Sequence, residues 1–169
     1  MALPTPITIA EEAALIQAQL QSFVATFGGT ASVVSNLREW WNQAATNSDS
    51  PRILICYMGE DSRGSFSQIS PWHRVDRKWS VAVTRGRGFY ANRGDSLLSA
   101  DIPESPLFDI VETVRDIIRA MQTISEETPS PDYRGIKPMQ LGNIVVDGFE
   151  ISFSTANDIP SNLTINQSN

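Results

Sequence analysis

An unbroken apolar stripe in residues 105–127, SPLFDIVETVRDIIRAMQTISEE, is the feature that most constrains the fold of this chain. Its apolar residues recur at helical spacing and predict a helix with one continuous buried face. They are Leu107, Ile110, Val111, Val114, Ile117, Ile118 and Met121. Ser105 suits the N-cap position, and Pro106 suits the first helical position. A helix of about 19 residues spans about 28 Å and needs an apolar cover of similar length.

Two alternating segments are suited to supply that cover. In RKWSVAVTRG and in FEISFS every second residue is apolar, which is typical of strands with one buried face. The apolar positions are Trp79, Val81, Val83, Phe149, Ile151 and Phe153, and the opposite positions include Lys78, Ser80, Ala82, Thr84, Glu150, Ser152 and Ser154. We therefore expect a sheet that packs one face against the long helix.

The remaining elements complete an α+β layout. Thr8 and Glu11 form a capping-box pattern before a helix over about 9–27, which Gly28 and Gly29 end. A second helix is expected within residues 32–46, a buried strand over 52–58, and a hairpin over 143–155 with a positive-φ turn at Asp147–Gly148. The predicted order is helix, helix, strand, strand, long helix, strand, strand. The fold class is a small mainly antiparallel sheet packed on one long amphipathic helix, with N-terminal helices.

The length of 169 residues favours a single domain over 1–169, with 41% hydrophobic and 19% charged residues. We expect an ordered core over about 8–160 and a polar C-terminal tail over about 161–169. The N-terminal residues MALPTPITIA lack the pattern of a secretory signal, and no window approaches the roughly 20 apolar residues of a membrane span. We therefore expect a protein made inside a cell, without a membrane partner.

Catalytic and metal-binding patterns are weak in this sequence. Cys56 is the single cysteine, so it excludes an internal disulfide and a multi-cysteine metal site. Its place in the apolar run ILICYM favours a buried side chain over a nucleophile. His73 is the single histidine, and neither a Cys–His pair nor a metal site with Glu60 and Asp61 has a supporting motif. The sequence predicts no enzyme, no metal and no cofactor, but a binding or assembly protein.

Positive charge is concentrated in residues 74–95 of a chain whose net charge is −6. Six of the 13 Lys and Arg residues lie there, and the predicted interface residues are Arg74, Arg77, Lys78, Arg85, Arg87, Phe89, Tyr90 and Arg93. A phosphate backbone would suit them and would bind in a salt-dependent way. An acidic protein surface would also suit them, including that of a second copy of this acidic chain, in contacts that close into a ring. A solvated strand face without a partner is the third interpretation.

The order of these elements resembles the tail terminator (tail completion) proteins of long-tailed bacteriophages. The resemblance covers about residues 8–160. It is carried by the N-terminal amphipathic helix and by the segments PRILICYMGE, RKWSVAVTRG, PLFDIVETVRDIIRAM and GNIVVDGFEISFSTANDIP. A second helix with Trp40 and Trp41 departs from the family pattern by lengthening the N-terminal region.

This resemblance implies an α+β fold and a homo-hexameric ring at the head-proximal end of the tail tube. The ring would stop tube polymerisation and meet a head connector or stopper protein, and it would be assembled in the host cytoplasm and located in the virion. DNA would pass through an acidic or neutral lumen without specific binding, while the loop within 85–95 would contact a neighbour, the tube or the connector. Two alternatives remain: another head–tail neck or adaptor protein, and a small nucleic-acid-binding module that uses the basic stretch, with Phe89 and Tyr90 as stacking groups.

Overall fold

The computed structural model of the chain describes residues 7–36, 38–39, 42, 51–62, 72–84, 107–121, 131–141 and 144–160. The elements are α1 (Ile9–Val24), the 3-10 helix η1 (Ala25–Phe27), β1 (Thr30–Val34), β2 (Arg52–Ser62), β3 (Trp72–Thr84), α3 (Leu107–Ala120), β4 (Asp132–Leu141) and β5 (Ile144–Pro160). The strands form one sheet of order β1-β2-β3-β5-β4, in which β1 and β2 are parallel and the other pairs are antiparallel. The predicted α+β class is confirmed.

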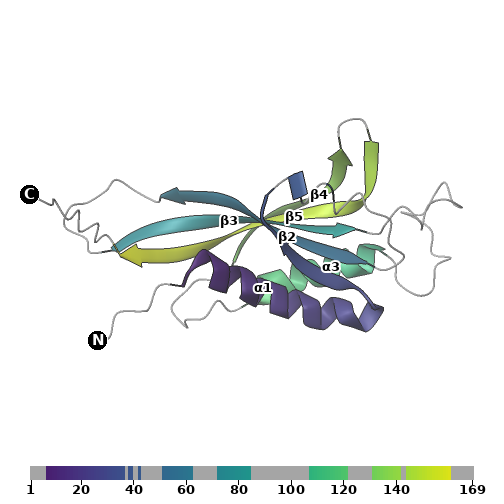
Figure 1. The fold of residues 1–169 in the computed structure, drawn as a ribbon, viewed down its shortest axis with the longest axis horizontal. Coiled ribbons are helices and arrows are strands. Elements are labelled where there is room, and N and C mark those ends of the chain that lie inside the picture. The colour runs from purple at the N-terminus through teal and green to yellow at the C-terminus, as the bar shows by residue number, and fades with distance from the viewer. Residues whose placement is uncertain are drawn as a thin grey trace, which may run out of the picture.

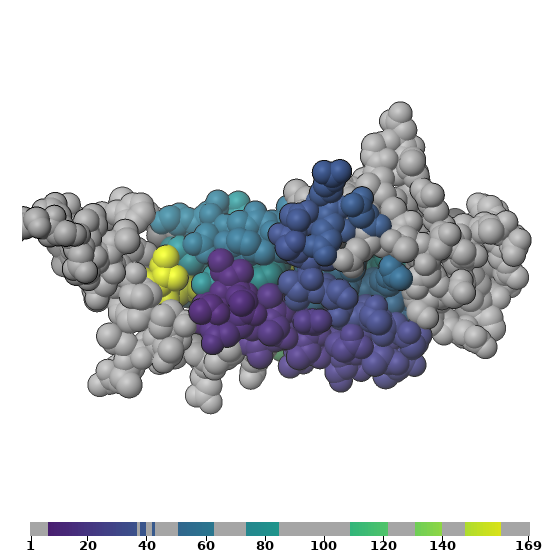
Figure 2. All heavy atoms as spheres, viewed as in Figure 1, coloured from purple at the N-terminus to yellow at the C-terminus, as the bar shows by residue number. Residues whose placement is uncertain are grey.

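Both helices lie on the same face of the sheet (Figure 1). α1 packs mainly over β1 and β2, and α3 packs over β3, β4 and β5. The core between the layers includes Ile16, Leu20, Val81, Val114, Ile118, Ile151 and Phe153. The two predicted alternations are therefore confirmed, because the apolar positions of β3 and β5 face the helices. In the space-filling view, α1 lies along one long side of the molecule with β2 and β3 above it (Figure 2).

The beginning of α1 follows the capping box expected from the sequence. The Thr8 hydroxyl accepts a hydrogen bond from the Glu11 N–H at 3.2 Å, and the Glu11 carboxylate accepts from the Thr8 N–H at 2.8 Å. The α-helix ends at Val24, and η1 continues to Phe27 before Gly28 adopts a φ of 68°. The predicted span of 9–27 is thus helical throughout, but its last turn is a 3-10 helix.

The second predicted helix is wrong in its first part, because Thr30–Val34 forms β1. This strand pairs in parallel with residues Arg52–Cys56 of β2. Val33 lies in this strand and is 41% exposed. β-branched residues favour strands, and pairing with β2 reinforces that preference. Helical residues follow at Arg38, Glu39 and Asn42, while Trp40 and Trp41 lie outside the described residues.

The turn predicted at Asp147–Gly148 is also wrong. Gly148 lies inside β5 opposite Thr84, and its φ is not positive. A Cβ at this position would lie 2.7 Å from the carbonyl oxygen of Val83, so the glycine is needed for close approach of two strands. The connection between β4 and β5 instead falls at residues 142–143. β2 and β5 are also longer than predicted, ending at Ser62 and Pro160.

Candidate functional site

The structure describes the side chains of three of the eight predicted interface residues, all of them on β3. Arg74 and Lys78 are exposed on the face of the sheet that the helices leave open, and Arg77 is buried on the helix face. Arg85, Arg87, Phe89, Tyr90 and Arg93 lie outside the described residues. Successive residues of a strand point to opposite faces. On β3 the predicted cationic surface therefore contains Arg74 and Lys78 but not Arg77.

Arg77 is an internal residue with internal partners, which corrects its prediction as a surface cation. It is 4% exposed. Its Nη1 atom lies 2.8 Å from Oε2 of Glu12 and 2.9 Å from the carbonyl oxygen of Ile7. Its Nε atom lies 3.5 Å from Oε2 of Glu60 and makes no hydrogen bond. Arg77 thus joins α1, β2 and Ile7, which precedes the N-cap of α1.

The Glu12 carboxylate is the centre of this buried network. Glu12 is 1% exposed and accepts hydrogen bonds from Arg77, from Trp79 Nε1 at 3.2 Å, from Asn157 Nδ2 at 3.2 Å and from the Thr155 hydroxyl. Two donors reach each carboxylate oxygen, so the lone pairs available on an ionised carboxylate are occupied. Burial of a charge is tolerated when it is paired and hydrogen-bonded in this way. The network fixes the first turn of α1 on β3 and β5, and the carboxylate has no free acceptor site for a substrate.

A β-bulge in β2 brings Glu60 to the same face as Arg77. The register shifts between Tyr57 and Glu60, so that Tyr57 pairs with Trp79 and Glu60 pairs with Arg77. Two residues of β2 therefore lie opposite one residue of β3, and Gly59 within the bulge has a φ of 102°. Glycine adopts this conformation readily, whereas residues with a Cβ do not.

Glu12 was not predicted as a functional or structural site. Glu12 lies four residues before Ile16 and eight before Leu20, on the stripe that α1 buries. A carboxylate on an apolar stripe is a signal that it has a buried partner. Glu60 carried no comparable signal, because its orientation depends on the bulge.

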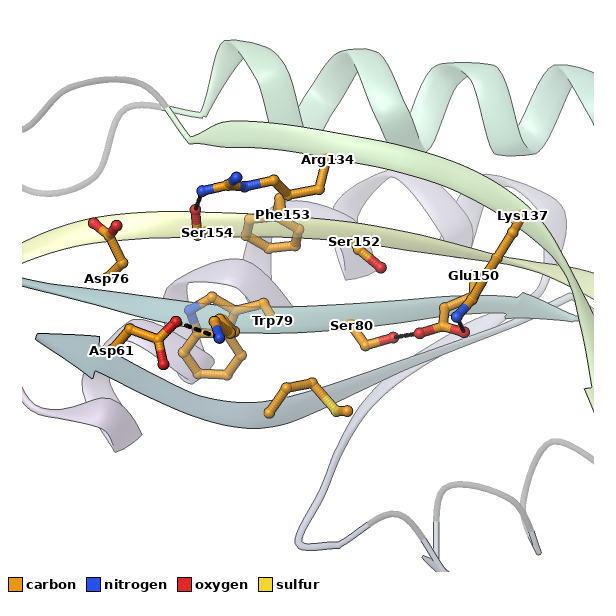
Figure 3. Close-up of a pocket in the computed structure, with 12 residues that line it drawn as sticks. Asp61, Asp76, Trp79, Ser80, Arg134, Lys137, Glu150, Ser152, Phe153 and Ser154 are labelled. Atoms are coloured by element: carbon orange, nitrogen blue, oxygen red, sulfur yellow. Dashed lines mark hydrogen bonds and ion pairs between the residues drawn. The ribbon is translucent and has the colours of Figure 1, made fainter. Parts of the chain in front are cut away.

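A polar trough of about 490 Å³ lies on the face of the sheet opposite α1 and α3 (Figure 3). This face is open only in part, because it also carries a second buried cluster of Val34, Leu54, Cys56, Ala82 and Met139. Small side chains of the central strands lie along it, namely Ser80 on β3 and Ser152 and Ser154 on β5. Charged residues surround them: Asp61, Asp76, Lys78, Arg134, Lys137 and Glu150. Ser80 donates to Glu150 at 2.7 Å, and Arg134 donates to Ser154 at 3.3 Å.

The cations around the trough have carboxylate partners within the chain. Lys78 pairs with Asp61, Lys137 with Glu150 at 3.0 Å, and Arg134 with Asp132 at 2.9 Å. The trough therefore presents both signs of charge in alternation. Such a surface complements another protein better than it complements a phosphate backbone, which attracts uncompensated cations. Arg134 and Lys137 were not among the predicted interface residues, because Gly135 and Pro138 obscured the strand β4. Glu150 was predicted on the polar face of its strand but was not assigned to an interface.

The Cys–His pair considered from the sequence is not formed. Cys56 lies opposite Ser80, and His73 is seven residues further along β3, a separation of about 23 Å along a strand. The Cys56 thiol is buried and lies 3.6 Å from the carbonyl oxygen of Tyr57. Burial, followed by the nearby charge of Glu150, raises the pKa of this thiol. These features are those of an unreactive cysteine.

Within the described ranges, no group of three or more His, Cys, Asp and Glu residues is arranged to hold a metal ion. None of the helices in that part of the chain is long and apolar enough to cross a membrane. Neither a scan against protein-family models nor a search of curated proteins finds a match to this chain. The functional proposal therefore depends on the fold and on the charges of its surfaces.

Proposed function

We propose that this chain is a structural assembly protein similar to the tail terminators of long-tailed bacteriophages. In this role it forms a homo-oligomeric ring of about six copies that caps the head-proximal end of a tail tube. The ring joins the tube to a head connector or stopper protein and lets DNA pass without specific binding. The α+β fold, with a small sheet and helices along it, supports the proposal because it is the architecture that the resemblance implies.

The charge compensation on β3 and around the trough is the observation that carries this proposal. Of the three described cations in the basic stretch, Arg77 is buried against Glu12 and Glu60, Lys78 is paired with Asp61, and Arg74 is exposed. A module that grips nucleic acid needs cations that are free to replace counterions along the phosphates. Compensated charges on an open sheet face suit a specific contact with another folded protein, because they favour one orientation of the partner.

The proposed role requires neither a cofactor nor a reaction at the chain. It places the protein in the virion, at the junction of head and tail, after assembly in the host cytoplasm. The basic stretch, including Arg85 and Arg87, would contact a neighbouring subunit, the tube or the connector in this arrangement.

Light scattering on the purified protein at low and high salt, with negative-stain images of the same samples, tests the proposal. We expect closed rings of about six copies of the 18.6 kDa chain. A gel-shift assay with single- and double-stranded DNA and RNA on the same preparation is the second arm. A monomer that binds nucleic acid tightly at low salt and releases it at high salt would refute the proposal in favour of a nucleic-acid-binding module.

A further inference from the structure

The edges of the sheet are poorly suited to strand addition by a second copy. β4, at one edge, has two register irregularities and contains Pro138, which cannot donate a backbone hydrogen bond. β1, at the other edge, has only five residues, and β2 beyond it carries the bulge at Gly59 and the acidic residues Glu60 and Asp61. Short strands, bulges, prolines and charges are the devices that keep sheet edges from pairing. Copies of this chain would therefore meet through their faces.

The trough on the open face presents cations at its β4 side. The side chain of Lys137 is 66% exposed, whereas that of its partner Glu150 is 14% exposed, so the ammonium group lies outermost. Arg134 is exposed on the same strand, and the labelled side chains in Figure 3 show both residues reaching over the trough from β4. The neighbouring serines are short and leave room between these cations and β2.

The outer surface of α3 carries two exposed carboxylates, one of which, Glu112, interacts electrostatically with Arg115 of the same helix. Asp109 and Glu112 are exposed and lie three residues apart, on one side of the helix. Asp116, in contrast, is paired with Arg115 at 2.9 Å. The exposed acidic pair therefore lies on the helix layer, and the outermost cations lie on the opposite layer of the molecule.

We propose that, in the ring required by the proposed function on which this inference rests, α3 of one copy lies in the trough of the next copy. Asp109 and Glu112 then face Arg134 and Lys137. The dimensions agree, because β2 and β4 are separated by three strand spacings, about 14 Å, and a helix with its side chains is about 10–12 Å wide. Since the two surfaces lie on opposite layers, the contact is head to tail, and every copy offers both halves of it.

Charge-reversal variants test the pairing by light scattering and negative stain. The variant Arg134→Glu/Lys137→Glu and the variant Asp109→Lys/Glu112→Lys each place like charges in the contact, so each is expected to lose the ring and run at the mass of a single chain. An equimolar mixture of the two variants restores both contacts in an alternating ring, and it is expected to recover the wild-type mass. The chain with all four substitutions restores the contact between identical copies, so its ring can hold an odd or an even number of them.

Arg52→Glu is the matched control, because it reverses a partly exposed cation on the same face, outside both the trough and the basic stretch, and is expected to leave the ring intact. Salt is a second control. The Debye length, over which charges act on one another, shortens from about 10 Å at 0.1 M to about 3 Å at 1 M, so rings are expected to weaken at high salt. All variants should keep the circular dichroism spectrum and the melting temperature of the wild type within a few degrees.

Three results would overturn this contact. Rings that persist in both charge-reversed variants place the subunit contact elsewhere and leave the proposed function standing. Loss of rings that neither the mixture nor the fourfold variant restores rejects the pairing of these four residues. A wild-type chain that stays monomeric at every salt and protein concentration rejects the self-contact. The gel-shift assay with DNA and RNA then tests the proposed function separately.

Discussion

Removal of the Glu12 carboxylate is the most informative single perturbation of this fold. Glu12→Ala leaves the Arg77 guanidinium buried with Glu60 at 3.5 Å as its remaining charged partner. It also removes one acceptor from each of Trp79, Asn157 and Thr155, all of which are buried. Trp79 and Asn157 then keep only the Thr155 hydroxyl, at 3.3 Å from each. A buried donor without a partner keeps its full desolvation penalty, and this penalty is larger for a charged group.

The expected loss of stability follows from the burial of both partners. Breaking a buried ion pair by removing one partner destabilises proteins by about 3–5 kcal/mol. For a chain of this size 1 kcal/mol corresponds to a shift in melting temperature of about 2–4 °C, so the melting temperature should fall by roughly 6–20 °C. Glu12→Gln keeps the shape of the side chain and an acceptor oxygen, and we expect an intermediate loss.

Urea unfolding followed by tryptophan fluorescence, together with calorimetry, measures the free energy of unfolding for these variants. Gln19→Ala is the matched control, because it removes an exposed polar side chain from the same helix and should change stability by no more than about 0.5 kcal/mol. The double variant Glu12→Leu/Arg77→Met removes both charges. Its loss of unfolding free energy should therefore be smaller than the sum of the losses in the two single variants. Equal destabilisation by Glu12→Ala and Gln19→Ala would refute a structural role of the buried carboxylate.

Three further predictions concern other parts of the molecule. The backbone N–H and the hydroxyl of Thr8 hold the pKa of Glu11 below its ordinary value of 4.5, so this contribution to stability is present above that value and is lost as the pH falls through the lowered pKa. Thr8→Ala removes the hydroxyl but keeps the backbone N–H, so the pKa should rise part of the way to 4.5 in an NMR titration, and an unchanged pKa would contradict the hydroxyl contact. Native Cys56 should resist a thiol reagent at pH 8 and react once the chain is unfolded in urea, whereas rapid reaction of the folded protein would contradict its burial. Gly148→Ala should lower the free energy of unfolding by about 1–3 kcal/mol because its Cβ meets the Val83 carbonyl oxygen, and a neutral effect would show that β3 and β5 move apart readily.

Sequence patterns predicted the elements whose apolar spacing is regular. The stripe of α3, the alternation of β3 and β5 and the capping box of α1 each depend on residues within one element, so local patterns were sufficient to predict them. The same alternation predicted which face of β3 is buried, and the burial of Trp79 and Val81 confirms it.

The errors arose where pairing with a distant strand decides the conformation. Thr30–Val34 becomes a strand because β2 lies beside it, and Gly148 continues β5 because Thr84 lies opposite. The burial of Arg77 depends on two residues far away in sequence, Glu12 and Glu60. The orientation of Glu60 depends in turn on the bulge in β2. Tertiary context overrides local preference in each of these cases.

The central pairing of β3 with β5 has a consequence for the synthesis of this chain. The apolar face of β3 is complete once Thr84 has been made, but the pairing strand begins opposite it at Gly148. At about 5–20 residues per second, the intervening chain takes roughly 3–13 s to synthesise. During that interval Trp79, Val81 and Val83 have no β5 to pack beside, and late closure of such distant pairs is slow. Expression at a lower temperature, or with a chaperone that holds exposed strands, should therefore raise the soluble yield more than any change at the surface of α3.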